Sequence, residues 1–239
     1  MKRFALLALA CLPLAAADVL VVADEFPAME VLARALQSGA GLSTAIVKQP
    51  EMPKDFAPFR AVVVYVHRNL DEAVEKASIA YARAGGKLVL LHHTISSGKR
   101  KNREWFPFLG VELPARDFAQ GGYKWLDPVD WEMVNLAPGH PITTGGVKYP
   151  GATEYRGETR PSIAFSHSEV YLNHALSGPR TVLMGLKYRD PNTGTVYMQD
   201  TGGWTMRADK GTVTYLMAGH STAEFEIPAY ARIVVNAIR

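Results

Sequence analysis

Residues 85–93 read Gly-Gly-Lys-Leu-Val-Leu-Leu-His-His, and this segment indicates the fold more clearly than any other. The two glycines end a helical pattern, and Lys87 is followed by four apolar residues in a row. An apolar run that does not alternate with polar residues is typical of a strand covered on both faces, as in parallel sheets. The segment therefore predicts a buried strand with two histidines at its carboxyl end.

Similar strands and helices flank this segment on its amino-terminal side. We predict a strand at residues 18–23, a helix at 27–38, two strands at 43–47 and 60–66, and a helix at 70–84 that leads into the segment quoted above. Acidic residues in the first turns of the second helix favour its amino-terminal end. The alternation predicts an α/β fold, namely a mostly parallel sheet with helices on both faces.

The remainder of the chain is less regular but completes the same domain. We predict a short helix or turn at residues 105–109, strands at 181–187 and 211–217, and a closing helix at 228–238. Residues 110–160 contain many glycines and prolines and give no clear pattern. Because we find no internal repeat and no linker, we predict one domain over residues 18–239.

The first 17 residues have the pattern of a secretory signal peptide, with a basic head, an apolar stretch and a run of alanines. We expect cleavage after Ala17 and a secreted or periplasmic protein. The apolar stretch is shorter than the roughly 20 residues of a membrane-spanning helix, so no stable span is expected. A lipid anchor on Cys11 and a buried first strand or helix are the alternatives.

Composition excludes several classes of function. The 239 residues carry a net charge of only +3, and the single basic run is residues 99–103, which argues against nucleic-acid binding. Cys11 is the one cysteine, so a disulfide scaffold is excluded. If the signal peptide is removed, every mechanism that needs a thiol is excluded as well.

Candidate functional residues follow the predicted strands. In an open parallel sheet, ligands bind outside the carboxyl ends of the strands, where His92, His93 and His220 are expected to share one site. Glu169 and Tyr171 occupy alternating positions and would face the same side of an extended segment. The five residues are our candidate catalytic set.

Other residues admit two interpretations each. Trp204 follows two glycines and could stack on a sugar ring from a loop, or it could pack in the core. His140, in a turn before Pro141, is a second candidate for substrate binding, with a structural role as the alternative. We interpret His67 as a hydrogen-bonded loop residue and His174 as a surface residue.

Four segments in this order resemble the ThuA-like (trehalose utilisation) family. They are residues 85–93, residues 140–145 (His-Pro-Ile-Thr followed by Gly145), residues 168–171 (Ser-Glu-Val-Tyr) and residues 211–220, and the resemblance extends over about residues 60–239. The resemblance implies a flavodoxin-like fold of the class I glutamine amidotransferase type. In the amidotransferases a cysteine nucleophile lies on the turn occupied here by His92 and His93, so glutamine hydrolysis through a thioester is excluded.

The resemblance also implies a function in carbohydrate catabolism, with a small carbohydrate as the substrate. The expected chemistry is isomerisation or cleavage of a sugar or 3-keto-sugar through removal of a proton next to a carbonyl. His92 or His220 would be the base, Glu169 would orient it or relay the proton, and Tyr171 would donate to the substrate oxygen.

Two alternatives stay open for the same site. His92, His93, Glu169 and His220 could bind zinc or another divalent ion, although their spacing in the sequence is not diagnostic. A carbohydrate-binding or scaffold protein that keeps the fold without catalysis is the alternative from a different class. The sequence does not predict the oligomeric state.

Overall fold

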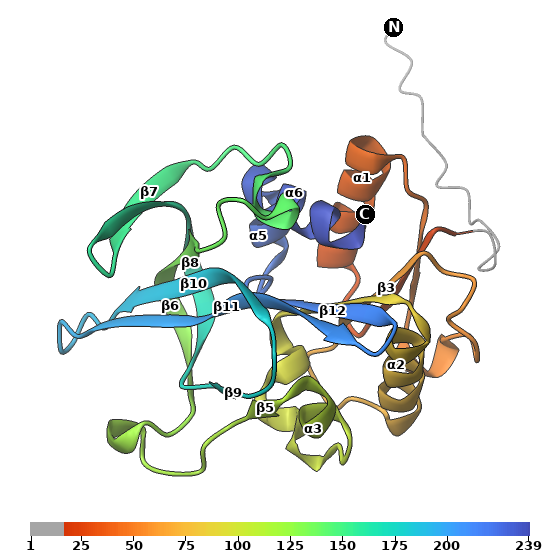
Figure 1. Ribbon diagram of the computed structural model, residues 1–239, viewed down its shortest axis with the longest axis horizontal. Helices are drawn as coiled ribbons and strands as arrows, with labels where there is room; N and C mark the ends of the chain where they lie inside the picture. Colours follow the sequence, from red (N-terminus) through yellow and green to blue (C-terminus); the bar gives the residue numbers. More distant parts are fainter. Residues whose placement is uncertain (1–16) are drawn as a thin grey trace, which may run out of the picture.

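The computed structural model describes residues 17–239 (Figure 1). The predicted signal peptide therefore lies, except for Ala17, outside the described residues. Within this part of the chain, no helix combines the length and the apolar composition that a membrane span requires.

A ten-stranded sheet runs through the whole domain in the order β2-β1-β3-β4-β12-β11-β10-β6-β8-β7. Its strands are β1 (Val19–Ala23), β2 (Thr44–Val47), β3 (Ala61–Tyr65), β4 (Lys87–Leu91), β6 (Lys124–Asn135), β7 (Gly151–Tyr155), β8 (Glu158–Leu172), β10 (Thr181–Arg189), β11 (Val196–Ala208) and β12 (Gly211–Leu216). A separate pair joins β5 (Val111–Glu112) and β9 (Ala175–Leu176).

The parallel half of the sheet agrees with the prediction. Strands β2, β1, β3, β4 and β12 pair in parallel, and all residues of β1 and β3 are buried. The helices lie on both sides of this half: α1, α5 and α6 above the strands in Figure 1, and α2 and α3 below them. These are α1 (Pro27–Ala40), α2 (Glu72–Ala84), α3 (Trp105–Leu109), α5 (Thr222–Glu226) and α6 (Pro228–Ile238), with a single turn, α4 (Pro141–Thr144), between β6 and β7.

The prediction of a mostly parallel sheet is wrong for the second half. From β12 onward every pairing is antiparallel, through β11, β10, β6 and β8 to β7. Long strands occupy the region that the sequence left without a clear pattern. Residues of β7 and the first part of β8 are largely exposed, so these strands lack the apolar runs that indicate parallel strands.

Candidate active site

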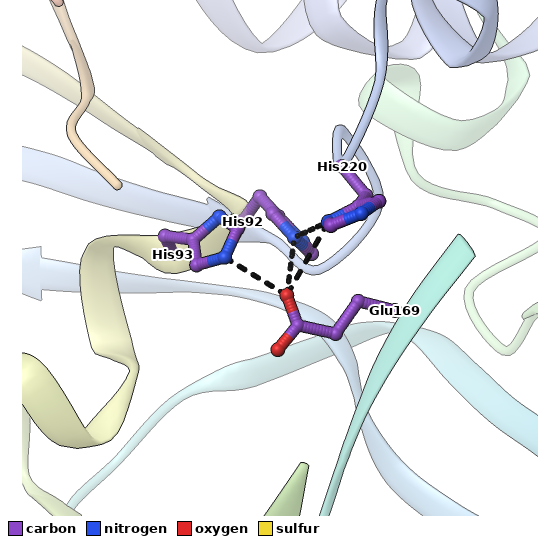
Figure 2. Close-up of side chains that lie close together, drawn as sticks. All are labelled: His92, His93, Glu169 and His220. Atoms are coloured by element: carbon purple, nitrogen blue, oxygen red, sulfur yellow. Dashed lines mark hydrogen bonds and ion pairs between the residues drawn. The ribbon is translucent and has the colours of Figure 1, made fainter. Parts of the chain in front are cut away.

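Histidines from two neighbouring parallel strands and a carboxylate from the antiparallel half meet in one cluster (Figure 2). His92 and His93 follow β4, His220 follows β12 by a few residues, and Glu169 comes from β8. Because β4 and β12 pair in parallel, their carboxyl ends lie side by side. The structure thus brings together His92, His93 and His220, which were selected because they follow predicted strands.

His92 is held in one orientation by its surroundings. Its side chain is fully buried, and its Nδ1 lies 2.6 Å from the carbonyl oxygen of Met217. The Tyr215 hydroxyl donates to the carbonyl of His92 over 3.2 Å. A carbonyl can only accept, so Nδ1 carries a proton, and in a neutral ring Nε2 then has a lone pair. That Nε2 points into the cluster.

Glu169 places a single oxygen at the centre of the cluster. Its Oε2 lies 3.2 Å from His92 Nε2, 2.8 Å from His93 Nε2 and 3.3 Å from His220 Nδ1, while the other carboxylate oxygen points away from the rings (Figure 2). The hydroxyl of Tyr171 donates to the same Oε2 over 3.1 Å. Burial alone would raise the pKa of Glu169, but the contacts with His220, His92 and His93 outweigh it and hold the pKa well below its usual range.

His220 is positioned through its backbone and through its second ring nitrogen. The Glu224 carboxylate accepts the backbone N–H groups of Gly219 and His220 over 2.6 and 3.2 Å. The ring's Nε2 lies 3.5 Å from Asp127 Oδ1, which leaves Nδ1 facing Glu169. The contact with Glu169 raises the pKa of His220.

His93 completes the cluster from the position directly after His92. Burial, together with the neighbouring His92, lowers the pKa of His93 to about 3, so the neutral imidazole predominates near neutral pH. Its buried Nδ1 has no hydrogen-bond partner among residues 17–239.

The four side chains offer the donor set of a metal site. One nitrogen from each histidine and one oxygen from Glu169 all lie within 4.8 Å of one another. Three imidazoles and a carboxylate are ligands that zinc and other divalent transition ions accept.

A cavity of about 350 Å³ opens onto the cluster. Its lining includes His93, Glu169, Tyr171 and His220, and it adds residues that the sequence did not select: His67, Tyr123, Trp125 and Asp127. The size is at the lower end of the range for small-molecule sites.

His67 belongs to this cavity, and its interpretation as an ordinary loop residue missed that placement. Its ring packs against His93 with 3.9 Å between ring centroids, and its Nδ1 lies 3.5 Å from Asp24 Oδ1. The Asp24 carboxylate also accepts the backbone N–H groups of His67 and Arg68. Asp24 follows β1 as His67 follows β3, so the rule of strand ends could have selected both.

Two predicted substrate-binding residues lie elsewhere. Trp204 is fully buried in β11 and packs against Tyr215, so its interpretation as an exposed loop residue is wrong. His140 accepts the backbone N–H of Ile142 at the start of α4 and borders a hollow at the opposite ends of β4 and β12. His174 is buried rather than on the surface, near the carbonyl of Ile95.

Comparison with known proteins places the chain by its fold. No family model matches the sequence, and no curated protein does. A protein from Bacteroides uniformis described as ThuA-like is similar in structure, with a TM-score of 0.59 and 16% identity over 92% of this chain and 89% of that one. A cytoplasmic protein from Salmonella typhimurium gives a TM-score of 0.61 at 15% identity, over 92% and 97% of the two chains.

Parts of larger carbohydrate-active proteins have a related fold. The chain matches 30% of a β-galactosidase from Bacillus circulans with a TM-score of 0.55 and 12% identity, over 92% of this chain. It also matches 32% of the carbohydrate deacetylase Agd3, with a TM-score of 0.52 and 11% identity, over 90% of this chain. At these identities the likeness concerns the fold alone. The resemblance inferred from the four sequence segments is thus confirmed at that level: the chain has the fold of a ThuA-like protein.

Proposed function

We propose that this protein is an enzyme of carbohydrate catabolism that holds a divalent metal ion between His92, His93, Glu169 and His220. It would remove a proton next to a carbonyl group of a sugar or 3-keto-sugar. The observation that carries the proposal is the orientation of His92, whose Nδ1 donates to the Met217 carbonyl.

This orientation creates a conflict that a cation resolves. A neutral His92 presents the lone pair of Nε2 to the Glu169 carboxylate at 3.2 Å and to His220 Nδ1 at the same distance. Contact of the His92 Nε2 lone pair with the Glu169 carboxylate and with His220 Nδ1 is electrostatically unfavourable unless a proton or a metal ion lies between them. A carbonyl or carboxylate on the outer ring nitrogen is the usual partner of a metal-binding histidine, and His92 has Met217 while His220 has Asp127.

The donor set also limits the coordination. Four protein donors fill a tetrahedral zinc site, so a catalytic ion here would have five or six ligands, as Mn²⁺ or an expanded zinc site does. Donors on opposite sides of an ion are about 4.2 Å apart. Because all four donor atoms lie within 4.8 Å of one another, small side-chain movements would suffice to bring them to an ion. Such an ion, held by these residues, would supply positive charge beside the carbonyl oxygen of the substrate.

With four side chains committed to the ion, proton transfer falls to His67. It is the imidazole of the cavity whose ring nitrogen contacts Asp24 rather than Glu169. Asp24 lies beside Nδ1, so Nε2 is the atom that would take the proton from carbon. Tyr171 donates to Glu169 and fixes the carboxylate.

The assignment to carbohydrates is supported by the four sequence segments and by the fold. The proteins of similar fold include one described as a carbohydrate deacetylase and one described as a β-galactosidase. These descriptions apply to those proteins, and only the link to carbohydrates enters the proposal. The reaction proposed here differs from hydrolysis of either kind, since it needs only an acidic C–H bond beside a carbonyl.

Metal binding is the first test. The purified protein is dialysed against a chelator and then against Zn²⁺ or Mn²⁺, and bound metal is measured by mass spectrometry. We expect one ion per chain in the wild type and a loss of at least tenfold in affinity in His92→Ala and His220→Ala. His140→Ala is the matched control, because His140 borders the hollow at the amino-terminal ends of β4 and β12, away from the cluster.

Chemistry is tested with the same samples. Disaccharides and their 3-keto derivatives are incubated in D₂O and followed by NMR, with metal-loaded and chelated protein. Deuterium entering next to the carbonyl, or cleavage, only in the loaded sample supports the proposal. Metal binding without exchange or cleavage would leave a non-catalytic binding protein, and no metal binding would overturn the centre.

We also propose that the chain is exported, with cleavage after Ala17. Mass spectrometry of the protein recovered from periplasmic and cytoplasmic fractions tests this. A mature amino terminus at Asp18 is expected, and an intact Met1 in the cytoplasmic fraction would contradict it.

A further inference from the structure

Trp125 is exposed beside the cluster, in contrast to the other tryptophans. Its exposed fraction is 54%, and it is the one large hydrophobic side chain exposed within residues 17–239. Trp105, Trp131 and Trp204 are at most 3% exposed. An indole that faces water loses the free energy that burial would provide, about 25 cal/mol for each Å² left uncovered.

The strand register places Trp125 on the face that carries the carboxylate of the cluster. In the antiparallel pairing of β6 with β8, Trp125 stands opposite Tyr171. Directly opposed residues of an antiparallel pair project from the same face of the sheet. Tyr171 in turn donates to Glu169 Oε2 over 3.1 Å, so Trp125 projects on the side of that contact.

The residues around Trp125 combine apolar and polar surface. It lines the same cavity as Tyr123 and Asp127, and the lining also includes Arg68 and Asn69 from the segment after β3. Asp127 lies beside His220 as well, so the cavity continues from the indole to the cluster. A pyranose ring has this same division, with C–H groups on its faces and hydroxyl groups around its edge.

We propose that Trp125 is the platform on which the sugar ring stacks, and that it determines the preference of the site for pyranosides. The indole covers the C–H face of the ring. Asp127 accepts hydrogen bonds from hydroxyl groups, while Arg68 and Asn69 donate to them. This inference rests on the proposed function, since it assigns the sugar to the cavity beside the proposed metal centre.

Because Trp125 is exposed, its fluorescence can report the binding of a sugar directly. As the exposed tryptophan, it is the one that acrylamide quenches most effectively in the free protein. The metal-loaded protein is titrated with trehalose, maltose, sucrose and the 3-keto derivative of trehalose. We expect at least one of these sugars to change the fluorescence in a saturable manner and to protect against acrylamide.

Variants identify the residue responsible. We expect Trp125→Ala to raise the Kd measured by calorimetry at least tenfold and the KM of exchange in parallel, with kcat within about threefold. Trp125→Phe keeps an aromatic face and should recover most of the affinity while losing the fluorescence signal. Trp131→Phe, on the same strand but buried, is the matched control and should keep both the signal and the affinity.

The outcomes separate this inference from the proposed function. If Trp125→Ala binds the sugar as tightly as the wild type, the platform is wrong while the metal centre and its chemistry stand. If the wild type binds one metal ion but none of the four sugars, both the platform and the assignment to carbohydrates are overturned. A normal metal content in Trp125→Ala with weakened sugar binding supports the platform, because a misfolded centre would lose the ion.

Discussion

His92 has an unusual backbone for a histidine. Its φ is 49°, in the left-handed region that non-glycine residues adopt at a cost of about 1–3 kcal/mol. With this backbone conformation directly after β4, the ring contacts the Met217 carbonyl through Nδ1 and Glu169 through Nε2. Strain of this kind is characteristic of functional sites, where the surrounding contacts hold it.

Asp127 gives a prediction for an outer contact of the proposed centre. Removing it in Asp127→Ala takes away the acceptor beside His220 Nε2, so the ring loses its preferred tautomer. We expect metal affinity to fall 10–100-fold, measured by competition with a chelating dye. Asp130→Ala, on the same strand but bonded to the backbone of His167, is the control. Equal affinities in the two variants would contradict the role of Asp127.

His67 gives a prediction about rate rather than binding. In His67→Gln the side chain keeps polar groups but cannot take a proton at neutral pH, so the exchange rate should fall roughly 10²–10⁴-fold. The metal content should remain one ion per chain. His167→Gln, on an exposed bend of β8, should keep the wild-type rate. A normal rate in His67→Gln would move the role of the base to another residue.

The sequence predicted the members of the candidate site that stand in a recognisable local pattern. Position after a strand selected His92, His93 and His220, and alternation selected Glu169 and Tyr171. The pairing of His67 with Asp24 joins residues 43 positions apart, which no local pattern reveals. Trp204 was misplaced because two glycines indicate a loop, whereas here Gly202 lets β11 approach β10: an added Cβ would lie 2.6 Å from the Gly185 carbonyl oxygen.

At the scale of elements, the half-buried Asp24 and the buried Lys99 hold the segment after β3 against its neighbours. Asp24 accepts the backbone N–H groups of His67 and Arg68 from the end of β1. Lys99 is fully buried and donates to the carbonyls of Val66 and His67 over 2.7 and 3.1 Å. Burial lowers the pKa of Lys99 to about 8. The backbone N–H groups and carbonyls of this segment that are named above therefore have hydrogen-bond partners, which keeps His67 in place.

The contact of Asp24, after β1, with the segment after β3 ties the two strands together and makes the free energy of unfolding depend on pH. Burial would raise the pKa of Asp24, but its bonds with His67 and Arg68 bring it well below the usual value. The stabilisation is complete above the unfolded pKa of about 3.9 and is lost as pH falls below it, because the unfolded chain then binds the proton more readily. Asp24→Asn should cost about 1–3 kcal/mol at pH 6.

Urea unfolding of the wild type and Asp24→Asn at pH 6 and pH 3 measures this dependence. The difference between the two proteins should shrink at pH 3. A difference that stays constant would show that the carboxylate's charge contributes nothing to the tie.

The parallel strands and the antiparallel strand β10 were predicted well, whereas the other antiparallel strands were not, for a physical reason. Strands β1, β3 and β4 are covered on both faces and therefore read as continuous apolar runs. Strand β6 has its first residues mostly exposed and contains Pro128, and β11 contains Asp200 and two glycines. Their pairing depends on partners distant in the sequence, which a local pattern does not contain.

At the scale of the whole molecule, the core is continuous across both halves of the sheet. Trp204 lies on β11, next to the parallel strand β12, and its ring packs against Tyr215. Trp204→Ala should lower the free energy of unfolding by about 3–5 kcal/mol, as is usual when a large buried aromatic is removed. Thermal and urea unfolding would measure the loss.

The folded fraction of Trp204→Ala should still bind one metal ion, because Trp204 does not line the cavity beside the cluster. A stability close to that of the wild type, together with weaker sugar binding, would restore the interpretation of Trp204 as a substrate contact.

The position of β12 has a consequence for how the protein is made. It follows the other strands of this sheet in the sequence, yet it lies between β4 and β11 and joins the two halves. During synthesis both of those neighbours keep an unpaired edge until residues 211–216 have left the ribosome. The sheet therefore stays open between β4 and β11 until residues 211–216 are available, and a nascent chain that folds this late would still be unfolded for the export that we propose.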